Sequence, residues 1–171
     1  MNNRKVRLMC IAGIFAAVIL LFTGFFHIPS HTGYTHIGDG FIYLAACILP
    51  LPYAAAAGAA GAMLADCFTG FAIWAPGTVI IKSITVLFFT GKSAKIITRR
   101  NMLALIPSAL LCSAGYCLYE TLITKSFIAS LAGIPGYITQ SVLSSLLFIL
   151  LGAALDKLKI KELIQIGGNK E

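Results

Sequence analysis

The sequence has 171 residues, a formal net charge of +7 and a mean hydropathy of +0.90, and only 11% of its residues are charged. Soluble domains carry about 25% charged residues, so this composition excludes an ordinary soluble fold. The length fits one membrane domain, and we expect a single transmembrane domain over residues 1–171.

Six apolar segments predict six membrane-spanning helices. A helix needs roughly 20 apolar residues to cross the hydrocarbon core, where its backbone groups must be bonded internally. The predicted spans are 6–26, 39–49, 53–69, 76–90, 102–123 and 134–155. The first is too long for the apolar region of a signal peptide, whereas the second is too short to cross without tilt, membrane thinning or its loops. The predicted fold class is all-α, an integral membrane six-helix bundle.

The basic residues predict the orientation of these helices. Eleven of the 13 lysines and arginines fall before or at the start of the first span, between the fourth and fifth, and after the sixth. They are Arg4, Lys5, Arg7, Lys92, Lys95, Arg99, Arg100, Lys157, Lys159, Lys161 and Lys170. Because six spans put all three groups on one side, and basic loops stay inside, we expect both termini to be cytoplasmic.

Polar groups within the spans gather near their predicted outer ends. They are Asp39, Asp66, Lys82, Glu120 and Gln140. Ionisable groups in a membrane are costly and mark function or pairing. A proton wire would need such groups along the whole depth, so this asymmetry favours a pocket open to the outside. Asp66 and Lys82 could instead pair with each other, and Lys82, Lys125 or a ligand donor could satisfy Glu120.

Aromatic residues lie at the same predicted level. Trp74, Tyr116, Tyr119 and Tyr137 could form pocket walls, because ligand pockets are mostly apolar with a few placed polar groups. The alternative is an interfacial belt of aromatic side chains, which membrane proteins commonly carry.

Small residues recur in the first span, where Ala12, Gly13, Ala16 and Ala17 place short side chains four apart twice. Such residues let helices approach closely in lipid. They predict either packing within this chain or a docking face for another membrane subunit.

The stretch GYTHIGDGFIYLAACILPLPYAAAAGAAGAMLADCFTGFAIWAPGTVIIK resembles the substrate-binding S components of energy-coupling factor (ECF) transporters. The resemblance rests on Gly38-Asp39, Ala65-Asp66, Gly70-Phe71-Ala72, Pro76-Gly77-Thr78 and Ile81-Lys82. It covers about fifty contiguous residues, and the six spans and the basic inner loops extend it over most of the chain.

The resemblance implies a six-helix bundle that binds one vitamin-like molecule near the outer face of a bacterial cell membrane, beneath a lid formed by the first outer loop. The first helix would dock on a transmembrane T component, and two cytoplasmic ATPases would drive transport. The chain has no GxxxxGK[ST] phosphate loop, so we expect ATP hydrolysis by the partners and no cofactor in this chain.

The resemblance leans toward carriers of queuosine precursors. A deazaguanine presents a donor edge that Glu120, Asp66 or Asp39 could accept, and its ring could stack on Trp74 or a tyrosine. Hydroxymethylpyrimidine, pyridoxine or riboflavin would suit nearly the same groups.

Three histidines in the first outer loop, His27, His31 and His36, leave several interpretations open. Imidazoles bind transition metals, but metal-carrying S components resemble one another in an N-terminal histidine, and this chain begins MNNRK. A solvated loop is a second interpretation. We favour a lid in which Tyr34, His36 and Asp39 close over an organic ligand. The five cysteines form no CxxC pair and predict neither disulfides nor a metal site.

Two rival functions remain from the sequence. A membrane enzyme could use Glu120, His36 and Asp39 for acid–base chemistry, but no residue resembles a nucleophile with its base, so we expect a non-enzyme. A stand-alone carrier or channel would need an inner polar path or paired repeats, and neither is visible.

Overall fold

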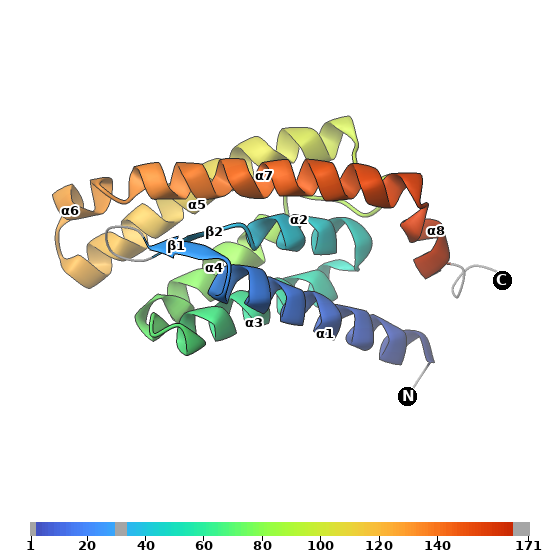
Figure 1. Cartoon of the computed structure of the whole chain (residues 1–171), viewed down its shortest axis with the longest axis horizontal. Coiled ribbons are helices and arrows are strands. Elements are labelled where there is room, and N and C mark those ends of the chain that lie inside the picture. The colour runs from blue at the N-terminus through green and yellow to red at the C-terminus, as the bar shows by residue number, and fades with distance from the viewer. Residues whose placement is uncertain (1–2, 30–33, 166–171) are drawn as a thin grey trace.

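The computed structural model describes residues 3–29 and 34–165, which form a mostly helical protein (Figure 1). In chain order the elements are α1 (Asn3–Gly24), β1 (His27–Pro29), β2 (Tyr34–His36), α2 (Asp39–Ile48), α3 (Leu51–Phe68), the 3-10 turn η1 (Ala72–Trp74), α4 (Ala75–Val86), α5 (Arg99–Thr124), α6 (Phe127–Leu131), α7 (Ile134–Lys157) and α8 (Ile160–Gln165).

Four helical stretches in the described chain are long and apolar enough to cross a membrane: 3–24, 51–68, 99–124 and 127–157. The prediction of a helical membrane protein is therefore confirmed. Two further apolar helices, 39–48 and 72–86, are shorter. At 1.5 Å per residue, α2 is about 15 Å long, roughly half the hydrocarbon thickness. Six full crossings and the cytoplasmic position of both termini remain predictions.

Prolines set the start of three helices. Pro52 in α3, Pro76 in α4 and Pro135 in α7 each occupy the first or second helical position. Proline is suited to this place because its fixed φ is helical and its missing N–H would have no partner there. The sequence also contains two short helices that we did not predict, α6 and α8.

Helix α2 lies mostly inside the protein. Eight of its ten residues are buried, and α1, α3, α4 and α7 all contact it. Tyr43 stacks on Phe89 at 4.7 Å between ring centroids and meets Phe148 edge-on at 6.0 Å. These rings, with Ile42 and Leu44, form the main apolar core.

Helices α1 and α3 approach closely along a path of small residues. A Cβ atom added to Gly61 would lie 2.5 Å from the carbonyl oxygen of Ala16 and 2.9 Å from the Cβ of Ile19. Close backbone approach through glycine and alanine is the usual packing of membrane helices. Part of the small-residue pattern in α1 is therefore used within this chain.

Strands β1 and β2 form an antiparallel hairpin that we predicted only as a loop, with His27 opposite His36. The hydroxyl of Thr35 donates to the carbonyl of Gly136 in α7 at 3.4 Å. The hairpin therefore lies across the end of the bundle at the start of α7. His31 falls outside the described residues.

The segment between α4 and α5 is held by buried polar side chains at the other end of the bundle. The amide of Asn101 donates to the carbonyls of Thr90 and Ile96, at 3.1 and 2.9 Å. The carboxylate of Asp156 accepts from the backbone N–H groups of Ile96 and Ile97. We expected the buried polar groups to gather near the outer end. This expectation was wrong for Asn101, which the sequence places between the fourth and fifth predicted spans and which is wholly buried.

Substitution of Gly61 by alanine tests the α1–α3 packing. The added methyl would overlap the main-chain oxygen of Ala16, which cannot rotate away, so overpacking should cost about 1–3 kcal/mol. We expect a lower melting temperature in detergent for Gly61→Ala. Gly13→Ala is the matched control, because its added Cβ would have no atom of the other described elements within 4 Å and alanine favours the helix. Equal melting temperatures for both variants would contradict this packing.

Candidate functional site

A small pocket lies below the hairpin, among β2, α3, η1, α4, α5 and α7. The residues that line it are Tyr34, His36, Asp66, Trp74, Thr78, Tyr116, Tyr137 and Gln140. Its volume of about 30 Å³ holds only a few water molecules. A ligand of vitamin size would therefore have to displace some of these side chains.

Aromatic rings make the walls of this pocket. Tyr116 stacks on Tyr137 with centroids 5.5 Å apart and planes 25° apart, and Trp74 meets Tyr116 at 6.0 Å. Tyr119 lies behind Trp74 and donates its hydroxyl to the carbonyl of Ile73 at 2.9 Å. Tyr119 thus supports the wall and does not line the pocket.

Asp66 offers an open acceptor to the pocket. Its Oδ1 accepts a hydrogen bond of 2.5 Å from the hydroxyl of Tyr34 in the hairpin. Thr78 lies near the carboxylate, but no group in the described chain makes a hydrogen bond to Oδ2, which is buried. A buried acceptor without a partner costs about 1–3 kcal/mol, so this oxygen favours a donor from a ligand or water.

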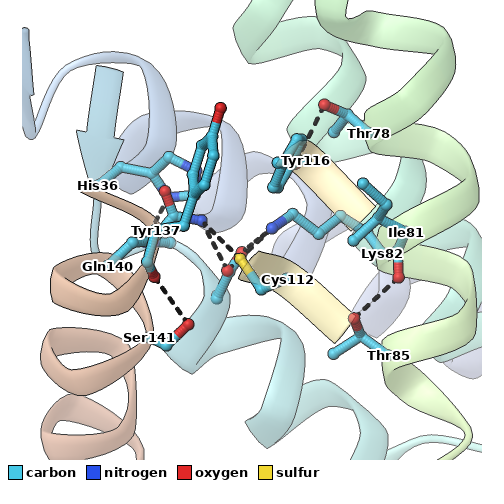
Figure 2. A network of polar contacts seen from close by, with 12 residues as sticks. His36, Thr78, Ile81, Lys82, Thr85, Cys112, Tyr116, Tyr137, Gln140 and Ser141 are labelled. Carbon is cyan, nitrogen blue, oxygen red and sulfur yellow. Dashed lines mark hydrogen bonds and ion pairs between the residues drawn. The ribbon is translucent and has the colours of Figure 1, made fainter. Parts of the chain in front are cut away.

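A buried ion pair lies beside the pocket. The ammonium of Lys82 lies 2.8 Å from the carboxylate of Asp39, and their side chains are 1% and 2% exposed. Gln140 donates to the same carboxylate at 2.9 Å, and Lys82 lies 4.9 Å from the ring centroid of Tyr116. Lys82, Tyr116 and Gln140 can be followed in Figure 2. The alternative that Lys82 pairs with Asp66 was wrong, because Lys82 reaches α2 and not α3.

His36 is neutral in this structure, because burial lowers its pKa to about 4. Its Nδ1 therefore accepts the backbone N–H of Gly38 at 3.2 Å. His27, opposite His36 in the hairpin, does not line the pocket, and its Nδ1 lies 2.6 Å from the carbonyl oxygen of Gly24. Among the residues that the structure describes, no group of three or more histidine, cysteine or acidic side chains could hold a metal ion.

Glu120 lies behind the wall formed by Tyr137. The Tyr137 hydroxyl donates to Oε2 of Glu120 at 2.7 Å, so Tyr137 is one donor to this carboxylate. Glu120 is fully buried but does not line the pocket.

The predicted site residues thus fall into three groups. Seven line the pocket: Tyr34, His36, Asp66, Trp74, Tyr116, Tyr137 and Gln140. Asp39 and Lys82 form the ion pair beside it, and Tyr119 and Glu120 support its walls. The sequence reading missed Thr78, whose hydroxyl lies 3.1 Å from that of Tyr116. Thr78 could have been predicted from its position four residues before Lys82, because residues four apart share one face of a helix.

The predicted docking residues divide between two faces of α1. Gly13 and Ala17 are exposed. Ala12 and Ala16 are half-buried, with Ala12 against the apolar core and Ala16 against Gly61.

Substitution of Lys82 by methionine tests the ion pair. It would leave the Asp39 carboxylate buried without its counter-charge, which typically costs 3–5 kcal/mol. We expect a large fall in the melting temperature, with partial recovery in Asp39→Asn/Lys82→Met. Lys95→Met, at an exposed position, is the control and should melt like the wild type. A stable single variant would show that the pair does not hold α2 to α4.

Comparison with known proteins assigns the chain to a transporter family. The model of the family "ECF-type riboflavin transporter, S component" matches residues 3–157. Comparison with curated proteins gave no match. The family match covers most of the chain, including every element that forms the pocket. It confirms the resemblance to S components, and it fits a transport subunit and not an enzyme. This integral membrane protein therefore belongs to the S component family of ECF-type riboflavin transporters.

Proposed function

We propose that this chain is the substrate-binding subunit of an ECF importer in a bacterial cell membrane and that it takes a small planar heterocycle from the outer side. The observation that carries the proposal is Oδ2 of Asp66, which has no hydrogen-bond partner among the described residues and belongs to a side chain that lines a pocket walled by Trp74, Tyr116 and Tyr137. In this proposal the chain has six membrane crossings and both termini in the cytoplasm.

The pocket chemistry supports a flat ring with an N–H or O–H donor. Offset stacking on an aromatic wall contributes about 0.5–1.5 kcal/mol beyond burial of area. A hydrogen bond to a charged acceptor contributes about 1.5–3 kcal/mol. The hydroxyl of Thr78 and the amide of Gln140 supply further polar contacts at the pocket edge. A ligand between these groups would be held by both its face and its edge.

Two ligands of this class are the first to test. Riboflavin is favoured by the family match, and its ring carries one N–H donor. A queuosine precursor such as queuine is favoured by the narrowness of the pocket and by its donor edge, which suits a carboxylate. Hydroxymethylpyrimidine and pyridoxine are smaller members of the same class.

The chain would work with a transmembrane T component and two cytoplasmic ATPases. We propose that Gly13 and Ala17 form the contact on α1, because these two small residues are exposed whereas Ala12 and Ala16 pack within the chain. The energy for transport would come from ATP hydrolysis by the partners.

Substitution of Asp66 by asparagine tests the proposed ligand contact. The change keeps the shape but replaces the charged acceptor, so we expect at least roughly tenfold weaker binding, as for loss of a charge-assisted hydrogen bond. The measurement is isothermal titration of the purified chain with riboflavin, queuine, hydroxymethylpyrimidine and pyridoxine. Glu162→Gln, on an exposed position of α8, is the control. Unchanged affinity for the bound ligand would remove Asp66 from the site.

Bulky substitution of Gly13 and Ala17 tests the docking face. Gly13→Leu/Ala17→Leu should leave ligand affinity unchanged, because both positions face outward from the bundle. It should abolish ATP-dependent uptake in vesicles that contain all partner subunits, because the added side chains prevent close helix approach. Ile14→Ala, at another exposed position of α1, is the control. Normal uptake by the double variant would refute this face.

A further inference from the structure

A large cavity lies where α1, the α2–α3 corner and the α4–α5 segment meet. Figure 1 shows that these parts of the chain lie at the end of the bundle opposite the hairpin. The volume of the cavity is about 1480 Å³, far larger than the pocket beneath the hairpin. The proposed function makes no use of it.

The polar part of this cavity is strongly basic. Arg4, Arg7, Lys92, Arg99 and Arg100 line it, and no acidic residue is among the described residues around it. Two acidic residues, Asp156 and Glu162, lie near this end of the bundle but do not line the cavity. Asp156 accepts two backbone N–H groups, and Glu162 is exposed on α8.

Two arginines of the cavity, Arg7 and Arg100, donate hydrogen bonds to neutral backbone carbonyls. Arg7 donates to the carbonyl of Leu163 at 3.0 Å, and Arg100 donates to the carbonyl of Phe88 at 3.3 Å. A neutral carbonyl orients a guanidinium but does not cancel its charge. These hydrogen bonds orient the two guanidinium groups, while their electrostatic attraction for an anion remains.

The remaining wall of the cavity is apolar. It includes Leu8, Ile11, Leu49, Val86 and Phe89. Leu51 and Leu87 also line it and are 49% and 55% exposed, so the apolar wall continues onto the side surface of the bundle. A basic rim above an apolar wall matches an amphiphile that carries a phosphate and an acyl chain.

We infer that this cavity binds an anionic phospholipid, with the headgroup phosphate among the basic residues and an acyl chain along the apolar wall. Basic pockets between membrane helices suit such headgroups, and each cation near an anionic surface contributes about 1 kcal/mol. A free phosphate would use only the rim, and a hydrophilic acidic protein segment would leave the apolar wall unmatched. This lipid site is separate from the proposed ligand pocket. Only the assignment of this end of the bundle to the cytoplasmic side rests on the proposed function.

Native mass spectrometry of the purified full chain tests the inference without any vitamin. The probes are phosphatidylglycerol and phosphatidylcholine with identical acyl chains, and glycerol 3-phosphate as the headgroup alone. We expect retention of phosphatidylglycerol, at least roughly tenfold weaker phosphatidylcholine and little glycerol 3-phosphate. Equal retention of the two lipids, or retention of glycerol 3-phosphate as strong as that of the whole lipid, would overturn it.

Charge-neutral variants locate the site. Lys92→Gln/Arg99→Gln removes two exposed cations of the cavity and should weaken phosphatidylglycerol binding roughly tenfold or more. Lys95→Gln/Lys157→Gln removes two exposed cations at the same end that do not line it and should bind like the wild type. Equal weakening by both pairs would show nonspecific attraction and overturn the inference. If Lys92→Gln/Arg99→Gln bound lipid normally but failed to assemble with the partner subunits, the cavity would be a contact for a partner. That result would also overturn the inference.

A photoreactive phosphatidylglycerol gives a result that does not depend on folding of the variants. With the wild-type chain, cross-links from a probe on the acyl chain should fall within residues 46–51 and 86–93. Labelling confined to the lipid-facing surface of α5 would overturn the inference.

Discussion

The arrangement of the bundle depends on the buried ion pair between Asp39 and Lys82. Two charges removed from water cost several kcal/mol each unless they are paired and hydrogen-bonded. Here the pair joins α2 to α4, Gln140 adds a contact from α7, and the ring of Tyr116 adds one from α5. Since the same tyrosine and glutamine also line the pocket, the geometry of the ligand site is tied to the charges beside it.

This pair also explains the division of roles among the helices. Helix α2 carries Asp39 and is buried on most of its surface, so its short length does not expose backbone to lipid. The longer α5 presents Leu103, Leu110 and Leu122 outward, each at least 65% exposed. Long helices such as α5 thus supply apolar outer surface, and the two short helices α2 and α4 carry the buried ion pair.

Composition and hydropathy predicted the helical membrane fold, because the bilayer imposes strict requirements on length and polarity. The position of polar residues along each span predicted which side chains would gather, and Tyr34, Asp66 and Gln140 do lie around one pocket. Pairings were less predictable. Asp66 and Asp39 stand at similar predicted depths, and the rotation of each helix, which the sequence pattern does not determine, decided which one Lys82 reaches.

The sequence also could not predict which aromatic residues line the pocket and which support its walls. Tyr116 and Tyr119 are three apart on α5, yet Tyr116 lines the pocket and Tyr119 supports Trp74 from behind. The hairpin pairs His27 with His36, and the sequence of these strands has no alternating apolar pattern that would predict it. Short strands of three residues carry too little periodicity to be recognised.

The chain contains a single tryptophan, and Trp74 lines the pocket between two tyrosines. All indole fluorescence of the protein therefore originates at this one place. Its emission wavelength reports the local solvent environment, and a coloured ring system in the pocket would quench it through resonance transfer. The protein thus carries an intrinsic optical sensor for occupancy, which needs no label and can be followed on the timescale of association.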